Sequence, residues 1–222
     1  MKLKHTTLFL ALLGTAALAS AQQAGAWSAS IGVTKLTPSV SSGTLSAPSF
    51  VNTQVDVDSS TALTGALNYA MSDNLVAHLP LGFGFKHTVK GAGSIAGPCC
   101  AIATTKALPI TLIGQYRFNA AQAQFRPYVG AGLTYANFYD ETGTGVLTAL
   151  TNPGGAPTTV RFKDKFAPTV QLGAVYNLNE QWYVDASYTK TLLKTRGTLS
   201  TGQHIDVKLN PSGLTFQVGY KY

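Results

Sequence analysis

The last nine residues, Leu214–Tyr222, read LTFQVGYKY and alternate strictly between large apolar or aromatic side chains and small or polar ones. The first face comprises Leu214, Phe216, Val218, Tyr220 and Tyr222, and the second comprises Thr215, Gln217, Gly219 and Lys221. Alternation with period two is typical of a β-strand whose two faces meet different surroundings. The pattern predicts a final strand that closes a β-barrel.

Seven other segments of the chain alternate in the same way. They lie near residues 27–33, 63–69, 75–85, 108–118, 129–135, 170–178 and 182–188. Segments of about ten residues are long enough for tilted strands to cross a bilayer, and no long window has helical periodicity. We therefore expect an all-β fold, an eight-stranded antiparallel transmembrane β-barrel.

The connections between these segments alternate in length. Short ones lie at 71–74, 119–124 and 179–181, whereas long ones lie at 37–59, 86–105, 140–165 and 193–204. Outer-membrane barrels have short periplasmic turns and long extracellular loops. Both ends of the barrel are then expected in the periplasm.

The composition favours a membrane barrel over a soluble one. Charged residues are 11% of the chain, and the polar strand faces hold Gly, Ser, Thr, Gln and Asn with very few Lys or Glu. A soluble barrel of the lipocalin type would instead place its apolar faces inside and its polar faces in water. The formal net charge of +7 comes without any block of Lys and Arg, so nucleic acid is not an expected partner. Spread basic residues facing anionic headgroups, including those of lipopolysaccharide, explain the charge more simply.

The beginning of the chain has the features of an export signal. Two lysines within the first four residues precede an apolar run at 8–18 and the small residues Ala19-Ser20-Ala21. The run is too short for a membrane-spanning helix. We expect a signal peptide at 1–21 and the barrel at 22–222.

Cys99 and Cys100 are the two cysteines of the chain, adjacent in the segment 86–105. A metal site needs four suitable ligands, or three and water, at workable spacing. No such set is evident in the sequence, so neither a metal nor a cofactor is expected. The cysteine pair is interpreted as incidental.

Several segments resemble the OmpW family of outer-membrane proteins, which also includes AlkL-type alkane-uptake barrels. The most specific is FRPYVGAGLTY at 125–135, followed by FYDE at 138–141. Weaker similarities are Phe85-Lys86-His87, the segments 105–109 and 115–118, and the segment 178–187. The resemblance implies an eight-stranded barrel with an apolar upper channel that passes small hydrophobic compounds. The loops differ from the family pattern, so the resemblance does not identify the solute.

The resemblance also implies a role for the final strand. In barrels of this kind, the outer-membrane assembly machinery recognises alternate apolar residues that end in a terminal aromatic residue. The candidate signal here is Phe216, Val218, Tyr220 and Tyr222.

Alternation places several charged residues inside the barrel, near its periplasmic end. Buried charges must be paired, and eight strands enclose just enough space for side chains to fill. We hypothesise that a set of polar side chains plugs the lower lumen. Its candidates are Arg117, Arg126, Asp185, Gln115, Gln171, Tyr128 and Gln217. The alternative is that one or more arginines extend to the lipid interface.

A plugged floor would require solutes to leave sideways into the bilayer. The segments 91–96 and 145–150 are apolar although expected in exposed loops, which suits entry from outside. Pro38, Pro80 and Pro109 lie in or beside strands, where each removes a hydrogen-bond donor. A local opening of the wall, best at Pro109, is one consequence; an ordinary β-bulge is the alternative.

An enzyme is the least favoured interpretation. His87 and His204 are expected near the extracellular rim, as loop histidines in contact with solvent. No G-x-S-x-G turn or persuasive acid partner accompanies them. We therefore expect a non-enzymatic, porin-like barrel for passive uptake of small hydrophobic molecules. A structural or surface-interaction barrel that transports nothing is the competing hypothesis.

Overall fold

The computed structural model describes residues 24–97 and 101–222. The expected signal peptide and the pair Cys99 and Cys100 lie outside these residues. Within them, no helix is long and apolar enough to cross a membrane.

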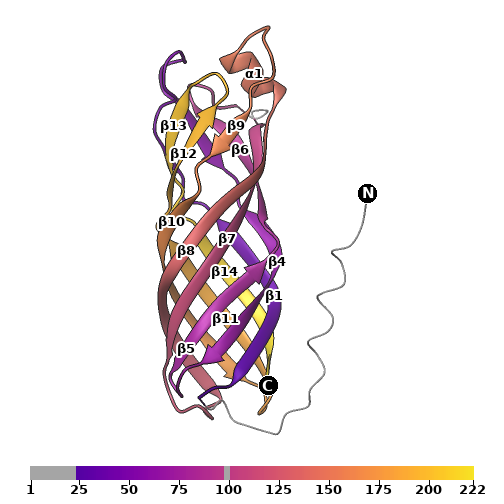
Figure 1. Cartoon of the computed structure of the whole chain (residues 1–222), viewed down its shortest axis with the longest axis vertical. Helices are drawn as coiled ribbons and strands as arrows, with labels where there is room; N and C mark the ends of the chain where they lie inside the picture. Colours follow the sequence, from indigo (N-terminus) through magenta and orange to yellow (C-terminus); the bar gives the residue numbers. More distant parts are fainter. Residues whose placement is uncertain (1–23, 98–100) are drawn as a thin grey trace, which may run out of the picture.

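Eight strand positions close into a tall antiparallel barrel (Figure 1). The wall consists of β1 (Trp27–Thr37), β4 (Ser60–Ala70), β5 (Leu75–Gly82) continued upward by β6 (Phe85–Gly93), β7 (Ala101–Arg117), β8 (Phe125–Gly143), β10 (Lys165–Asn177), β11 (Trp182–Thr191) and β14 (Ser212–Lys221). The final strand closes the ring, because β14 pairs with β1 from Ser28↔Lys221 to Thr37↔Ser212. The expected eight-stranded fold is confirmed.

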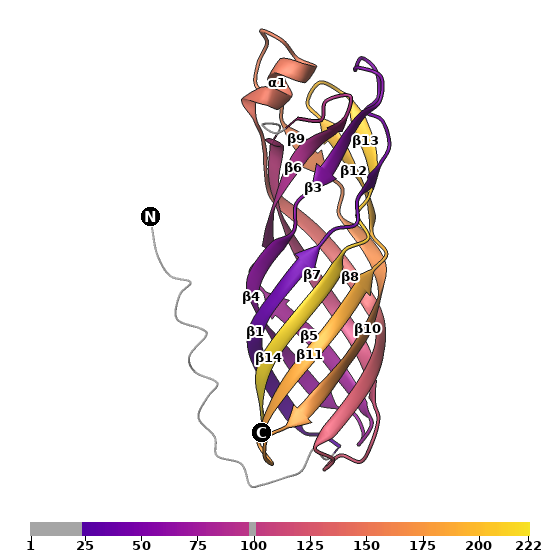
Figure 2. The ribbon, with the colours of Figure 1, turned by 180° about the vertical axis from the view of Figure 1, so that it is seen from behind.

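The connections define two ends of the barrel. At the lower end of Figure 1, short turns join β4 to β5, β7 to β8, and β10 to β11, as expected. At the upper end, the wall continues beyond the expected strands (Figures 1 and 2). This upper part adds β2 (Ser41–Ser42), β3 (Thr53–Val57), β9 (Val160–Phe162), β12 (Lys194–Leu199) and β13 (His204–Lys208).

The expectation that 37–59, 86–105, 140–165 and 193–204 are loops was therefore wrong in part. The physical reason is an inversion of polarity along the wall. In the lower barrel apolar side chains face outward, but in β12 and β13 the buried positions include Leu199, Ile205 and Val207 while the charged residues are exposed. An upper apolar core forms around them, as in a soluble barrel.

The segment 145–150, expected to be an exposed apolar loop, forms most of the short helix α1 (Gly145–Thr151). Thr144 caps it by accepting a hydrogen bond from the Leu147 backbone N–H. Leu147 is buried in the upper core, so this segment covers the top of the barrel rather than extending freely.

The outer face of the lower barrel is apolar between two levels of aromatic side chains. Its exposed aliphatic residues include Ile31, Leu63, Leu81, Ile110, Leu112, Leu133, Val170, Leu172 and Val218. Ring pairs lie near the lower end, with centroids 4.9 Å apart for Trp27–Tyr69 and 5.1 Å for Trp182–Tyr220. Tyr135 and Phe166 pair at 4.9 Å toward the top. An apolar band between aromatic girdles is the surface of a membrane-spanning barrel.

Candidate functional site

Polar side chains in the lower lumen hydrogen-bond to one another, and we call this part of the barrel the floor. Arg117 and Arg126 are 2% and 0% exposed, so neither extends to the lipid interface, in contrast to the alternative considered above. Arg117 donates from Nε and Nη2 to the Gln115 side-chain oxygen, at 3.1 and 2.9 Å. Gln115 in turn donates to Gln171 at 2.8 Å. Arg126 donates to the backbone oxygen of Asp73 in the β4–β5 turn.

Tyr128 connects the arginine to the acid of this network. The Arg117 guanidinium lies 5.8 Å from the centre of the Tyr128 ring. The Tyr128 hydroxyl donates to the two carboxylate oxygens of Asp185, at 3.1 and 3.0 Å. Arg117, Tyr128 and Asp185 come from β7, β8 and β11, so the network spans the lumen.

Two glycines make room for the tyrosines that cross the lumen. Gly173 lies opposite Tyr128 in the β8–β10 ladder, and a Cβ there would collide with the Tyr128 ring. Gly219 lies opposite Tyr183 in the β11–β14 ladder, with the same consequence for the Tyr183 ring. Each ring passes over a strand that lacks a side chain at that position, and its hydroxyl reaches the strand beyond.

Six of the seven candidate residues, Gln217 excepted, lie in the contacts just described. Gln217 lies higher in the barrel, where it accepts from Ser30 at 2.8 Å and donates to Thr64 at 3.4 Å. Lys221, at the lower end, donates to Asn177 at 2.7 Å.

Sequence reasoning missed four polar side chains that form a second set of contacts in the lower lumen: Ser28, Asn68, His78 and Tyr183. Tyr183 accepts a hydrogen bond from Asn68 at 3.2 Å, and its hydroxyl lies 3.4 Å from Ser28. Asn68 also contacts His78, with 2.6 Å between its side-chain oxygen and the histidine Nδ1. All lie on faces predicted to point inward, and that alternation was the available signal. It does not say which inward residues share a level, because this depends on the stagger of the strands.

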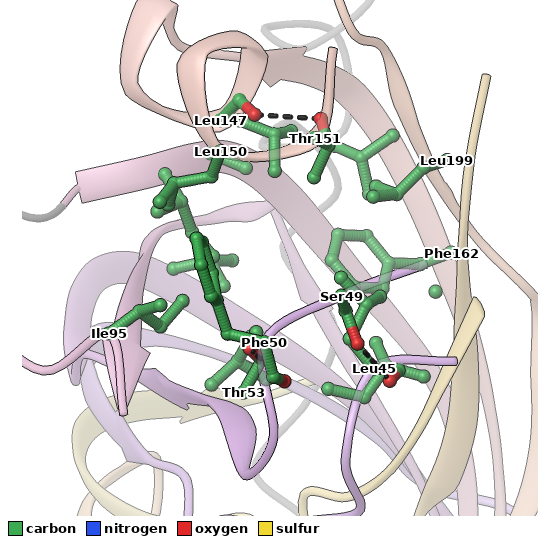
Figure 3. Close-up of a pocket in the computed structure, with 17 residues that line it drawn as sticks. Leu45, Ser49, Phe50, Thr53, Ile95, Leu147, Leu150, Thr151, Phe162 and Leu199 are labelled. Atoms are coloured by element: carbon green, nitrogen blue, oxygen red, sulfur yellow. Dashed lines mark hydrogen bonds between the residues drawn. The ribbon is translucent and has the colours of Figure 1, made fainter. Parts of the chain in front are cut away.

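Three cavities are stacked above this floor, from the upper end downward. The volumes that the centre of a water molecule can occupy in them are about 50, 70 and 100 Å³. Figure 3 shows the uppermost one, surrounded by apolar side chains such as Phe50, Leu150 and Phe162. The middle cavity is also mainly apolar and shares Leu36 and Pro109 with the lowest one.

The barrel wall has a break beside the lowest cavity. The β5–β7 ladder ends at His78↔Ile113, and the β6–β7 ladder begins at Phe85↔Ala107. Between these pairs, residues 79–82 pair with β4 alone and residues 108–112 with β8 alone. The two edges that face each other are therefore not joined by ladder hydrogen bonds.

Prolines lie on both edges of the break. Pro80 is paired with Ala66 of β4, and Pro109 with Ala136 of β8. Neither has a backbone N–H that could donate across the break. The bulge considered for Pro109 is not seen, because the β7–β8 register is regular there and shifts between Thr104 and Lys106.

The break also changes the alternation of the chain. Strict alternation through the predicted strand 75–85 places Phe85 on the outward face with Leu81 and Phe83, but Phe85 is 6% exposed and lines the lowest cavity. The ladder stops at Gly82 and resumes at Phe85, so the inward phase shifts by one residue. Leu81 and Leu108 border the same cavity, so it reaches both edges of the break.

Comparison with known proteins agrees with this geometry. The model of the OmpW family matches residues 23–222. The chain belongs to the OmpW family. Outer membrane protein W of Vibrio cholerae is 33% identical to it, over 99% of this chain and 100% of the relative. Outer membrane protein AlkL of Ectopseudomonas oleovorans is 25% identical, over 77% of this chain and 69% of its own. The crystal structure of OprG from Pseudomonas aeruginosa has the same fold, with a TM-score of 0.81, 24% identity, and coverage of 90% of this chain and 97% of OprG.

This OmpW-family chain is therefore a multi-pass outer-membrane barrel. Its short turns lie on the periplasmic side and its extended wall on the extracellular side. The relatives are named as outer membrane proteins.

The two histidines expected at the rim of this OmpW-family barrel, His87 and His204, lie in different environments. His87 was expected in a solvent-exposed loop, but it lies in β6 and is 4% exposed, with its Nδ1 2.7 Å from the backbone oxygen of Asp58. Burial lowers the pKa of His87, while the hydrogen bond with Asp58 acts in the opposite direction. His204 is exposed at the start of β13.

Proposed function

We propose that this barrel allows small hydrophobic molecules to cross the outer membrane passively. Solutes would enter among the apolar side chains of the extracellular end and descend through the stacked cavities. The polar floor would stop them, and they would leave through the break between β5–β6 and β7 into the bilayer.

One observation carries the proposal: the lowest cavity lies directly above the polar floor and is bordered by both unjoined edges of the wall. Pro80 and Gly82 line it from one edge, and Pro109 and Thr111 from the other. The two cavities above it are mainly apolar. The resemblance to AlkL-type alkane-uptake barrels supports the same class of solute.

The polar side chains of the floor support a closed periplasmic end. Gln115, Arg117, Arg126 and Tyr128 are at most 2% exposed. Opening a straight aqueous path would separate buried groups from their hydrogen-bond partners, which costs free energy for each group left unsatisfied. Solute exit through the wall avoids this cost.

The proposal can be tested with N-phenyl-1-naphthylamine, an apolar dye that fluoresces when it reaches lipid. Cells with a lipopolysaccharide-bearing outer membrane should take it up faster when they contain this barrel than when they lack it. In planar bilayers, the purified barrel should show no steady ionic conductance. Equal dye uptake with and without the barrel would instead favour the non-transporting structural or surface-interaction hypothesis.

The proposal treats the protein as a barrel without enzymatic activity. The contact of His87 with a main-chain carbonyl supports a structural role for that ring.

We also propose that Phe216, Val218, Tyr220 and Tyr222 serve as the signal for the barrel assembly machinery. Phe216 and Val218, on the outward face of the closing strand, are 54% and 45% exposed.

Lipopolysaccharide is the proposed lipid partner at the extracellular rim. Lys86 lies directly opposite Lys106, and Lys194 directly opposite Lys208, on opposite sides of the barrel. Like charges directly opposite each other are destabilising in a sheet. Lys106 is paired with Asp140 at 2.8 Å. Phosphate groups of the surrounding lipid would neutralise the remaining charge.

A further inference from the structure

Two rows of threonine hydroxyls line the lumen at the level of the wall break. The first row joins Thr111, Thr134, Thr169 and Thr191 across β7, β8, β10 and β11, with oxygen separations of 2.9, 2.6 and 2.9 Å. The second row joins Thr64, Thr34 and Thr215 across β4, β1 and β14, with separations of 2.8 and 2.9 Å. Together they cover every strand position except that of β5.

The strand β5 interrupts these rows because it offers no hydroxyl at this level. Thr64 is opposite Gly82, and continuing the register from His78↔Ile113 would place Pro80 opposite Thr111. The rows therefore end on either side of the wall break. Thr64 and Thr111 both line the lowest cavity.

Each row contains one O–H donor that the hydrogen bonds within the row do not use. Each hydroxyl has one O–H donor and two acceptor positions. Four hydroxyls joined by three bonds leave one O–H over in the first row, and three joined by two leave one in the second. The lowest cavity is lined by both ends of the first row, Thr111 and Thr191, and by all three threonines of the second row. A ligand in this cavity could accept hydrogen bonds from the two unused O–H groups.

His78 adds an acceptor to the same cavity. The side-chain oxygen of Asn68 can only accept, so the proton in the 2.6 Å contact belongs to Nδ1 of His78. In a neutral ring this leaves Nε2 as an acceptor. His78 and Thr111 lie on the two strands at the lower edge of the break, so a small polar group there could bond to both.

The described residues that line the lowest cavity include no Lys, Arg, Asp or Glu. An ion entering it would lose its hydration without gaining a counter-charge, which is costly. The middle cavity, which shares Leu36, Pro109 and Pro211 with the lowest one, offers an adjoining apolar volume. The pair of cavities thus suits a molecule with an alkyl chain and one uncharged polar group.

We propose that the lowest cavity binds the hydroxyl group of an aliphatic alcohol, with the alkyl chain in the middle cavity or the wall break. A hydroxyl both donates and accepts, so it can bond to His78 and to a spare threonine O–H together. The inference rests on the proposed uptake function and narrows its solute class to neutral amphiphiles. It distinguishes them from pure hydrocarbons and from fatty acids.

The test uses the full barrel in phospholipid nanodiscs, with 13C-labelled threonine methyl groups and 1-octanol labelled at C1. Nuclear Overhauser effects should connect the C1 protons to the methyl groups of Thr64 and Thr111. The Thr169 methyl is the control, because Thr169 belongs to the first row but lines none of the three cavities. This measurement needs no variant and so does not depend on how a variant folds.

Competition then measures the preference for the hydroxyl group. We expect 1-octanol to bind about five-fold more tightly than 1-chlorooctane, since one or two neutral hydrogen bonds are worth about that much. Octanoate should bind more weakly than either. Thr111→Val should reduce the preference to below about two-fold, whereas Thr169→Val should keep it.

Equal affinity for 1-octanol and 1-chlorooctane, a preference for octanoate, or equal effects at Thr111 and Thr169 would overturn the inference. Dye uptake by the wild-type barrel alongside any of these results would refute the alcohol site and leave the uptake function standing. Conversely, effects at Thr64 and Thr111 in a barrel that does not accelerate dye uptake would support the site and refute the uptake function.

Discussion

The hydroxyl of Tyr128 reaches across β10 to the carboxylate of Asp185, with 3.1 and 3.0 Å to its two oxygens. This contact joins two strands that are not neighbours in the barrel wall. It is possible because the strand between them carries Gly173 at the crossing point. The contact between Tyr128 and Asp185 therefore depends on a residue without a side chain as much as on the charged group.

Removing the Tyr128 hydroxyl should destabilise the barrel. Tyr128→Phe leaves the half-buried Asp185 without this hydrogen bond, which its two oxygens share, and a bond to a charged group contributes about 1.5–3 kcal/mol. The free energy of unfolding by urea in lipid vesicles measures the loss. Tyr188→Phe is the control, because Tyr188 bonds to Ser212 on the outer surface, and it should cost less than about 1 kcal/mol. Equal losses for the two variants would contradict this role of Tyr128.

A side chain at Gly173 should open the floor. Gly173→Val places methyl groups where the Tyr128 ring lies, so the ring must move, and overpacking of this kind costs about 1–3 kcal/mol. We expect ionic conductance in planar bilayers that the wild-type barrel lacks. Gly114→Val adds the same bulk on the outward face of β7, where a Cβ meets only the Ala131 oxygen at 3.8 Å. A Gly173→Val barrel as non-conducting as the Gly114→Val control would show that Tyr128 does not seal the floor.

Acid should loosen the extracellular part of β6. Burial lowers the pKa of His87 below its unfolded value of about 6.5, so the opened segment binds a proton that the closed one does not. Closure is then fully stable above about pH 6.5 and weakens as the pH falls below it. Hydrogen exchange at Val89, corrected for the intrinsic rate, should be faster at pH 5 than at pH 7.5. The control variant is His87→Gln. It leaves unchanged Asp58, whose backbone oxygen accepts from His87 and whose carboxylate pairs with Lys90. That variant should lose the pH dependence; if it keeps it, His87 is not the titrating group.

The lysine pairs at the rim should make stability depend on lipopolysaccharide. Replacing Lys194 and Lys208 with Gln removes one like-charge pair, so the variant should gain less thermal stability than the wild type when lipopolysaccharide is added to phospholipid vesicles. Lys90→Gln is the control, because Lys90 is already paired with Asp58 at 2.7 Å. Inorganic phosphate at the same concentration should not reproduce the effect. An unchanged gain in the double variant would argue against phosphate contacts at this pair.

The parts of the fold that could be predicted are those where the outward face is apolar. The alternation in Leu214–Tyr222 predicted both the strand and its outward face, because lipid selects apolar side chains there. The same rule fails above the membrane, where water lies outside. Leu199, Ile205 and Val207 point inward, so β12 was interpreted as part of a loop and β13 was not predicted as a strand.

The candidates for a plugged lower lumen were chosen by charge more than by alternation. Arg117, Arg126 and Asp185 stood out because a buried charge needs a partner. Tyr183 carries no charge and lies on the same inward face as its neighbour Asp185, so nothing local marked it. Its partners Ser28 and Asn68 are more than 100 positions away in the chain, and only the stagger of the strands brings them together.

The central claim is that solutes leave through the wall break, and Gly82→Leu tests it most directly. A Cβ at Gly82 would point toward Thr64 at the lowest cavity, so a leucine there should fill the cavity beside the break. Gly114→Leu adds the same side chain on the lipid-facing surface. At equal amounts of folded barrel, Gly82→Leu should reduce the rate of N-phenyl-1-naphthylamine uptake nearly to that of cells without the barrel, and Gly114→Leu should leave it unchanged. Uptake at the wild-type rate through the Gly82→Leu barrel would contradict the account.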